Sequence, residues 1–339
     1  MEADATRRAS TDDLQAIELD VATRQAILAQ AHRVSADNLR DKQDFFAQAK
    51  NEAAELPALL TDSIARFCAD ESSAAALLLS GLPLDDSLDD IPTPQDTSME
   101  HSEKPGQLSE TLLAMIGSLL GHTISYQQID DGALFHDIVP KSRLENDQSY
   151  ASSRTELVFH TEQHFHPYTP DYLLLHCLRG DDSAMTSYVS VQRLLGALTE
   201  ESVEVLSRPL FRSGIDHVFG NNRVEKGNGP VYPVFSGNTD NPRIRYDQEL
   251  MVPATEQARV AMRSLSEVMK QEACYICLRA GDLLVLDNRH CVHGRSAFTP
   301  RYDGTDRWLQ RSKIICNPEQ VGDDLAPDGR TILTRFDAQ

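Results

Sequence analysis

The chain has 339 residues, of which 40% are hydrophobic, so it can bury a substantial core. Its formal net charge of −20 argues against nucleic acids as partners, because phosphate groups require basic surfaces. The same acidity argues against binding to anionic membrane surfaces, and it is typical of a protein kept in solution by its charge.

The cysteines and the N-terminal segment indicate the compartment in which the protein works. Six cysteines are scattered along a chain that is too long to depend on disulfides, and the close pair Cys274 and Cys277 lacks a second pair to complete a zinc site. The N-terminus is polar, without the apolar segment of a signal peptide, and no hydrophobic run reaches the length of a membrane span. We therefore expect a cytoplasmic protein with reduced thiols.

The first part of the chain is predicted to be helical. Residues 1–18 are polar and are expected to be flexible, whereas residues 19–339 are expected to form a single domain. Within this domain the spacing of apolar residues predicts a helical part over about 19–121 and a β-rich core over about 122–320. The helical stretches are expected at 19–56, 59–79 and 108–120, and the proline- and aspartate-rich residues 82–107 are expected to form a surface connection.

Short strand-like runs dominate the rest of the chain, and no internal repeat is visible. Many short strands in one chain favour a barrel or jelly-roll core with helices packed outside it. Helices are expected near 191–198 and 255–271. The predicted strands are 133–139, 157–160, 172–177, 186–189, 231–235, 244–247, 273–278, 283–286 and 308–315.

Two potential metal ligands flank Thr161 at the end of the predicted strand 157–160. Residues i and i+2 of a strand point to the same side, so His160 and Glu162 converge. His293 follows the apolar run 282–287 about 130 residues later, and a distant third ligand is expected if two sheets of a barrel close around one metal. Two histidines and a carboxylate with this spacing are typical of a non-haem iron(II) site, which leaves positions open for oxygen and a co-substrate.

Other interpretations of the same residues remain open at this point. The pattern His-x-Glu is common, and it also occurs where a strand ends in solvent. His164 and His166 together with His160 could instead bind zinc in a hydrolase, although Pro167 argues against a long helix here. A third possibility is a non-catalytic barrel that binds a small molecule or a partner.

Two longer segments around these residues narrow the choice. Residues 160–181 and 287–311 resemble the clavaminate synthase-like group of iron(II)/2-oxoglutarate oxygenases, in particular the branch that hydroxylates free arginine, asparagine, lysine or citrulline. The resemblance covers roughly residues 40–320. It implies a mainly β fold with helical additions, in which a double-stranded β-helix (jelly-roll, cupin-like) core is flanked by α-helices. It also implies Fe(II) held by His160, Glu162 and His293, with 2-oxoglutarate and O2 as co-substrates.

The resemblance implies positions for two carboxylates as well. Arg307 matches the family's oxoglutarate-binding arginine, and Thr186 matches the threonine that donates to the same co-substrate. An ion pair of Arg307 with Asp303 or Asp306 is the alternative. Arg311, four residues further along the predicted strand, returns to the same face and matches the arginine that binds the α-carboxylate of the amino acid. Two inward arginines would be costly without anions, and two bound carboxylates remove that cost.

Further substrate contacts are implied by the resemblance. Asp247 matches the aspartate that holds the far end of the substrate side chain, and Glu162 is also expected to contact the substrate. Arg245 stands where arginine hydroxylases carry a second acid, and its charge favours a neutral side chain unless it pairs with Asp247 or points to solvent. The other candidates lie in two segments that the family uses for substrate contacts: Gln127, Gln128, Asp130 and Asp131, and Ser149, Ser152 and Ser153.

The resemblance therefore implies an iron(II)/2-oxoglutarate-dependent dioxygenase. Its expected reaction is hydroxylation of C3 or C4 of a free L-amino acid with a polar or basic side chain. Citrulline, arginine, lysine, asparagine and glutamine are the candidate substrates. The expected setting is the biosynthesis of natural products such as antibiotics.

Overall fold

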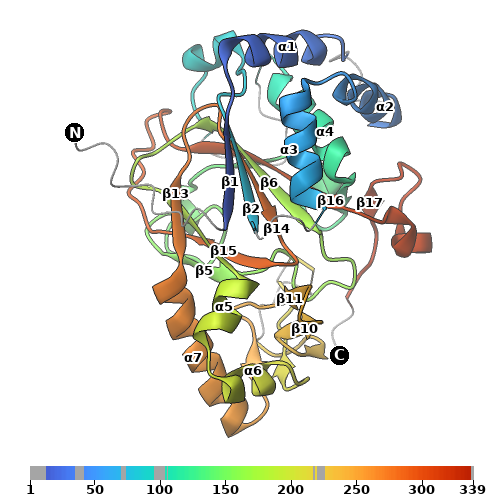
Figure 1. Ribbon diagram of the computed structural model, residues 1–339. Helices are drawn as coiled ribbons and strands as arrows, with labels where there is room; N and C mark the ends of the chain where they lie inside the picture. The colour runs from blue at the N-terminus through green and yellow to red at the C-terminus, as the bar shows by residue number, and fades with distance from the viewer. Residues whose placement is uncertain are drawn as a thin grey trace.

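The computed structural model of the chain describes residues 13–34, 42–69, 74–94, 104, 106–216, 218–219 and 226–336. Two β-sheets lie between two groups of helices, with α1 to α4 on one side and α5 to α7 on the other (Figure 1). Within the described part of the chain, no helix combines the length and the apolar character that crossing a membrane requires.

The larger sheet has eight strands, in the order β1-β2-β14-β6-β16-β3-β17, with β4 paired to β16 as well. Neighbouring strands are antiparallel except for the pairs β1–β2 and β3–β17, which are parallel. The strands are β1 (Leu14–Glu18), β2 (Ala76–Ser80), β3 (His122–Tyr126), β4 (His136–Ile138), β6 (Tyr172–Arg179), β14 (Leu283–Asp287), β16 (Trp308–Ile315) and β17 (Thr331–Ile332).

The smaller sheet has the strand order β13-β7-β15-β5 and faces the larger one. Its strands are β5 (Leu157–His160), β7 (Met185–Ser190), β13 (Cys274–Cys277) and β15 (Cys291–Arg295). Two minor sheets lie beyond it, formed by β8 (Phe211–Arg212), β9 (Val231–Tyr232) and β12 (Val252–Pro253), and by β10 (Phe235–Gly237) and β11 (Pro242–Ile244). The two facing sheets form the expected double-stranded β-helix.

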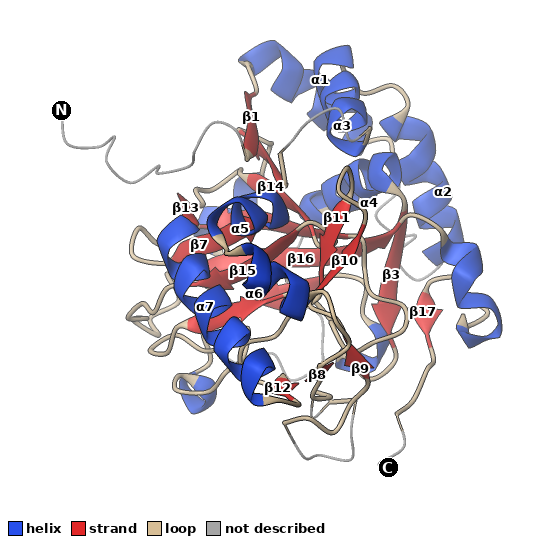
Figure 2. Cartoon of the chain, turned by 60° about the horizontal axis from the view of Figure 1, so that its bottom comes forward, coloured by secondary structure: helices blue, strands red, loops and turns tan. Residues whose placement is uncertain are grey.

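In the part of the chain that the structure describes, seven α-helices cover the outer faces of the two main sheets. Helices α5, α6 and α7 lie in front of the smaller sheet in Figure 2. Side chains of Asp20, Ser190, Thr199 and Thr255 accept hydrogen bonds from backbone amides at the starts of α1, α5, α6 and α7. The helices are α1 (Val21–Ala31), α2 (Lys42–Ala53), α3 (Ala58–Cys68), α4 (Leu108–Leu120), α5 (Val191–Ala197), α6 (Glu200–Leu206) and α7 (Glu256–Glu272), with short 3₁₀ turns η2 (Asp86–Asp90), η3 (Asp130–Gly132), η4 (Ser142–Leu144) and η5 (Pro318–Asp324).

Alternation along the strands builds separate apolar layers. On β6, Leu173 and Leu175 lie in the cluster between the two sheets, whereas Tyr172 and Leu174 pack against helices α1 to α4. On β16 the same rule places Leu309 between the sheets and turns Ile314 to the helices. Residues 311 and 313 lie two and four positions after Leu309 on the same strand, so they too face the smaller sheet.

The N-terminal part differs from the sequence-based expectation. Residues 1–12 of the segment expected to be flexible lie outside the described residues, but Leu14–Glu18 form the edge strand β1. The helix predicted over 59–79 ends at Cys68, and Ala76–Ser80 form β2. Every residue of β2 is buried, and a short run that is apolar on both faces has no periodicity to separate strand from helix. The division at residue 121 was therefore wrong, since two strands of the core come before it.

Candidate metal centre and co-substrate site

Three potential metal ligands meet between the two main sheets. His160 ends β5, Glu162 follows two residues later, and His293 on β15 lies opposite His160 in the register of the two strands. One ligand atom from each residue lies within 4.8 Å of the others, and Nε2 of His293 is 3.9 Å from Oε2 of Glu162. The third ligand thus comes from the neighbouring strand of the same sheet, and not from a facing sheet.

Backbone contacts fix the position of Glu162. The Oδ1 atom of Asn288 accepts a hydrogen bond from the Glu162 amide at 2.7 Å, while its Nδ2 donates to the Glu162 carbonyl at 3.1 Å. The intervening Thr161 donates from its amide to the carbonyl of Tyr246 at 2.8 Å. Asn288 precedes β15, so one carboxamide ties the segment of the first two ligands to the strand of the third.

This clamp gives a testable prediction. Replacing Asn288 by alanine is expected to lower Fe(II) affinity about 10- to 100-fold, the usual effect of removing a group that orients metal ligands. Asn317→Ala is the matched control, because Asn317 caps the exposed 3₁₀ turn that starts at Pro318. Anaerobic titration with Fe(II) measures both variants, and an unchanged affinity in Asn288→Ala would show that the clamp does not support the metal centre.

Both histidines of the triad are held in the form that a metal requires. Nδ1 of His160 lies 2.9 Å from the carbonyl oxygen of Val158. A carbonyl can only accept, so Nδ1 donates to it, and Nε2 is the ring nitrogen left for a metal. Burial, together with the nearby His160, lowers the pKa of His293 to about 3, so the imidazole of His293 is neutral.

The carboxylate of Glu162 is ionised, and its two oxygens face different groups. Burial alone would raise its pKa, but the charges of Arg311 and Lys313 outweigh this and hold the pKa of Glu162 well below its usual range. Nη1 of Arg311 and Nζ of Lys313 lie 3.2 and 3.6 Å from Oε1. Because Oε2 is the oxygen that faces His293, it is left for the metal. Two imidazoles and one carboxylate are a donor set that fits iron(II).

The other two histidines of the sequence motif have different partners. Nδ1 of His164 lies 3.6 Å from Oδ2 of Asp247, and Nδ1 of His166 accepts a hydrogen bond from the amide of Tyr168 at 3.0 Å. Gln163 has a left-handed φ of 51°, which ends the alternation that could have aligned His164 with the triad. Among the described residues, neither histidine joins a group of metal-binding side chains. The zinc cluster of His160, His164 and His166 was therefore wrong.

Arg307 is a buried cation that lacks a carboxylate partner in the described part of the chain. It precedes β16, is 6% exposed, and donates from Nη2 to Oγ1 of Thr186 on β7 at 3.4 Å. Asp303 and Asp306, the alternative partners, instead accept hydrogen bonds from backbone amides of their own loop. Burial lowers the pKa of Arg307. A buried guanidinium beside a hydroxyl fits the far carboxylate of 2-oxoglutarate, which would complete its charge pairing.

Arg311 and Lys313 stand side by side on the inward face of β16. The guanidinium of Arg311 lies over the ring of Tyr150, 5.1 Å from its centroid. Nζ of Lys313 lies 5.9 Å from the centroid of Tyr126, and burial and the charge of Arg311 lower the pKa of Lys313 to about 7, with Glu162 opposing the shift. Sequence analysis placed Arg311 on this face but missed Lys313, although its even spacing from Arg311 already predicted the same orientation.

Asp247 lies beside the metal ligands but is largely used by its own turn. It forms an isolated β-bridge with His160, and its Oδ1 accepts hydrogen bonds from the amides of Glu249 and Leu250 at 2.8 and 2.6 Å. Arg245 neither pairs with it nor points to solvent, because its Nη2 donates to Oγ1 of Thr169 at 3.3 Å. Only the second carboxylate oxygen of Asp247, which faces His164, remains for a ligand.

Among the seven other candidates, one residue lies near the cations and four have partners elsewhere. Asp130, with a left-handed φ of 45°, accepts a hydrogen bond from Nδ1 of His136 at 3.0 Å, and His136 is the register partner of Arg311. The described contacts do not join the other four to the triad. The side-chain amide of Gln128 donates to the carbonyl of residue 334. The hydroxyl of Ser152 donates to the carbonyl of Ser149 in a turn, and Arg295 donates to the same hydroxyl. The hydroxyl of Ser153 lies within hydrogen-bonding distance of the hydroxyl of Tyr302.

Comparison with known proteins agrees with this geometry. Residues 101–313 match the family described as taurine catabolism dioxygenase TauD, TfdA family. An L-lysine 3-hydroxylase of Catenulispora acidiphila is 34% identical over 314 residues, which cover 90% of this chain and 85% of that protein. A solved asparagine oxygenase in complex with Fe(II), 2S,3S-3-hydroxyasparagine and succinate superposes with a TM-score of 0.86 and 32% identity, over 94% of this chain and 99% of that one. The non-heme iron oxygenase OrfP, solved with Fe and α-ketoglutaric acid, gives a TM-score of 0.84 and 28% identity, over 94% and 100% of the two chains.

Proposed function

Because this chain belongs to the taurine catabolism dioxygenase TauD, TfdA family, we propose that it hydroxylates C3 or C4 of a free L-amino acid with a polar or basic side chain. The resemblance to clavaminate synthase-like oxygenases is thereby confirmed. The chain is an iron(II)- and 2-oxoglutarate-dependent enzyme, as predicted, and not a non-catalytic barrel.

The observation that carries the proposal is the convergence of two imidazoles and one carboxylate, with ligand atoms within 4.8 Å of one another. We assign Fe(II) to Nε2 of His160, Oε2 of Glu162 and the imidazole of His293. Arg307 and Thr186 are assigned to the far carboxylate of 2-oxoglutarate. Arg311 is assigned to the α-carboxylate of the amino acid, because it is the inward arginine next to Glu162.

When bound, iron(II) and 2-oxoglutarate activate O2, and the reaction yields succinate, CO2 and a substrate in which one C–H has become C–OH. The residues of this chain bind and orient the reactants for that step. Glu162 stays ionised because Arg311 and Lys313 neutralise the oxygen that does not face the metal. Glu162 and His293 are buried and His160 is half-buried, which limits the access of water to the reacting centre.

The proposal extends to the side chain of the substrate. The relatives named above include a lysine hydroxylase and an asparagine oxygenase, so both charged and neutral side chains occur among them. We place the far end of the side chain near Oδ2 of Asp247, and the α-ammonium near Glu162 and Asp130. The charge of the half-buried Arg245 favours a neutral acceptor such as an amide or ureido group. The hydroxylated amino acid would then serve the biosynthesis of natural products such as antibiotics.

All six cysteines are free thiols, which supports the further proposal that the enzyme works in the reducing cytoplasm.

A substrate screen tests the proposal. Protein purified without oxygen would be mixed with Fe(II), 2-oxoglutarate, ascorbate and O2, and with each standard amino acid, citrulline, ornithine or pipecolate. Mass spectrometry is expected to find one product heavier by a single oxygen atom, formed together with succinate and only when every component is present. If the protein binds iron and 2-oxoglutarate but hydroxylates none of these compounds, the free amino acid assignment is wrong.

A further inference from the structure

The amino group of Lys313 is buried, and no described residue offers it an acceptor within hydrogen-bonding distance. The residue is 1% exposed. The nearest acid is Glu162, whose Oε1 lies 3.6 Å away. An ammonium group has three donors and is strongly hydrated, so burying it with all three unsatisfied is unfavourable.

The neighbouring groups do not supply the missing acceptor. The hydroxyl of Tyr126 donates to the carbonyl of Tyr168 at 2.6 Å, and Asp130 accepts from His136. Oε1 of Glu162 is already bound by Arg311 at the shorter distance of 3.2 Å. Arg311 alone can therefore hold this oxygen away from the metal, and Lys313 is not needed for that task.

The charges around Glu162 are unbalanced. Two cations, Arg311 and Lys313, approach one oxygen of a single carboxylate. Nε of Arg311 also has no hydrogen-bond partner among the described residues. When the Glu162 carboxylate also binds a divalent metal ion, less of its negative charge remains to offset the two cations. A second anion at this place would satisfy the free donors of both residues and restore the balance.

We propose that Lys313 and Arg311 together bind the carboxylate of the substrate, one cation for each oxygen. The inference rests on the proposed function, and it adds a substrate-binding residue and a restriction on the substrate. A pair of cations recognises a free carboxylate, so an amino acid whose carboxyl group is an amide or a thioester lacks the group that they bind. The enzyme accordingly acts on the free acid and not on an aminoacyl thioester attached to a carrier.

Paired ligands with and without the carboxylate test the proposal. The probes are L-asparagine, L-citrulline and L-lysine, each compared with its α-carboxamide and with its N-acetylcysteamine thioester. Calorimetry under anaerobic conditions measures their binding to protein loaded with Fe(II) and 2-oxoglutarate. The variants are Lys313→Met, which keeps the length of the side chain without its charge, and Lys313→Gln, in case the first does not fold. Lys270→Met is the control, because Lys270 is exposed on α7.

Wild-type protein is expected to bind the acid at least tenfold more tightly than the amide or the thioester. Lys313→Met is expected to weaken binding of the acid about 10- to 100-fold while hardly changing binding of the amide, so the preference for the acid shrinks. In turnover, KM for the amino acid should rise with little change in kcat, because the carboxylate is bound equally before and during the reaction.

The binding measurements distinguish a failure of the Lys313 inference from a failure of the free amino acid assignment. If the preference for the acid over the amide is the same in wild type, Lys313→Met and Lys270→Met, or if the thioester binds as tightly as the acid, Lys313 does not bind the carboxylate and this inference is overturned. If loaded wild-type protein binds none of the amino acids of the substrate screen, the free amino acid assignment itself fails, and the inference falls with it.

Discussion

Replacing Glu162 by alanine is expected to abolish both Fe(II) binding and hydroxylation. The variant loses the one anionic ligand of the triad, and the two remaining imidazoles are too few to hold the metal with an open face. It also leaves Arg311 and Lys313 without the carboxylate that both approach, so an approaching cation meets uncompensated positive charge. Anaerobic equilibrium dialysis with Fe(II) and the hydroxylation assay measure the two effects.

Glu110→Ala is the matched control for this variant. Glu110 is also a buried carboxylate, but it pairs with Lys104 at 2.6 Å and with Gln310 at 2.8 Å on the outer side of β16. Breaking that buried pair is expected to cost about 3–5 kcal/mol of stability without changing Fe(II) affinity. Oxoglutarate-dependent turnover that survives in Glu162→Ala would remove this residue from the metal centre.

Replacing Arg307 by alanine is expected to raise KM for 2-oxoglutarate by about 30-fold or more. Removing one partner from a buried pair of charges costs about 2–5 kcal/mol, and each 1.4 kcal/mol is a factor of ten in binding. Fe(II) affinity should stay the same, since Arg307 contacts Thr186 and not the triad. Arg307→Lys should recover only part of the affinity, because an ammonium group cannot pair with both oxygens as a guanidinium does.

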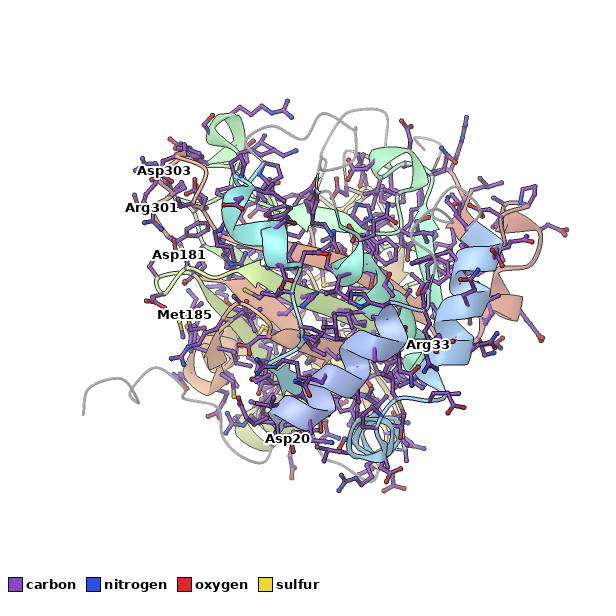
Figure 3. The ribbon with its side chains drawn as sticks, turned by 90° about the horizontal axis from the view of Figure 1, so that it is seen from above. Asp20, Arg33, Asp181, Met185, Arg301 and Asp303 are labelled. Carbon is purple, nitrogen blue, oxygen red and sulfur yellow. The ribbon has the colours of Figure 1, made fainter. Side chains whose placement is uncertain are left out.

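Arg301→Ala controls for the general loss of an arginine. Arg301 is exposed and lies with Asp303 at the outer edge of the molecule (Figure 3). Its replacement should leave KM for 2-oxoglutarate unchanged. The same KM in Arg307→Ala as in wild type would mean that another group binds the far carboxylate.

The convergence of His160 and Glu162 was predictable from sequence because it depends on local geometry. Alternation on a strand brings His160 and Glu162 together whatever the rest of the fold does. The sheet that supplies the third ligand was not predictable. His293 pairs with His160 in one sheet, and strand pairing over more than a hundred residues is set by tertiary packing. Strand β2 was not predictable either, because all its residues are buried and its sequence does not alternate between apolar and polar residues.

The substrate contacts were less predictable than the metal ligands. Asp247 was found by resemblance, but the sequence could not show that one of its oxygens caps the turn at Glu249 and Leu250. Ser149 and Ser152 were placed near the substrate, yet their hydroxyls serve a turn held by Arg295. Short polar side chains in loops bind nearby backbone as readily as ligands, and only coordinates separate the two cases.

The origin of the inserted oxygen atom tests the central claim most directly. The enzyme would be supplied with Fe(II), 2-oxoglutarate and the amino acid found in the substrate screen, once under isotopically labelled O2 and once in isotopically labelled water. An iron(II)/2-oxoglutarate oxygenase is expected to place one labelled atom from O2 in the hydroxylated amino acid, with one succinate formed for each product. Label entering the product from water instead, or product formed without 2-oxoglutarate, would contradict the account.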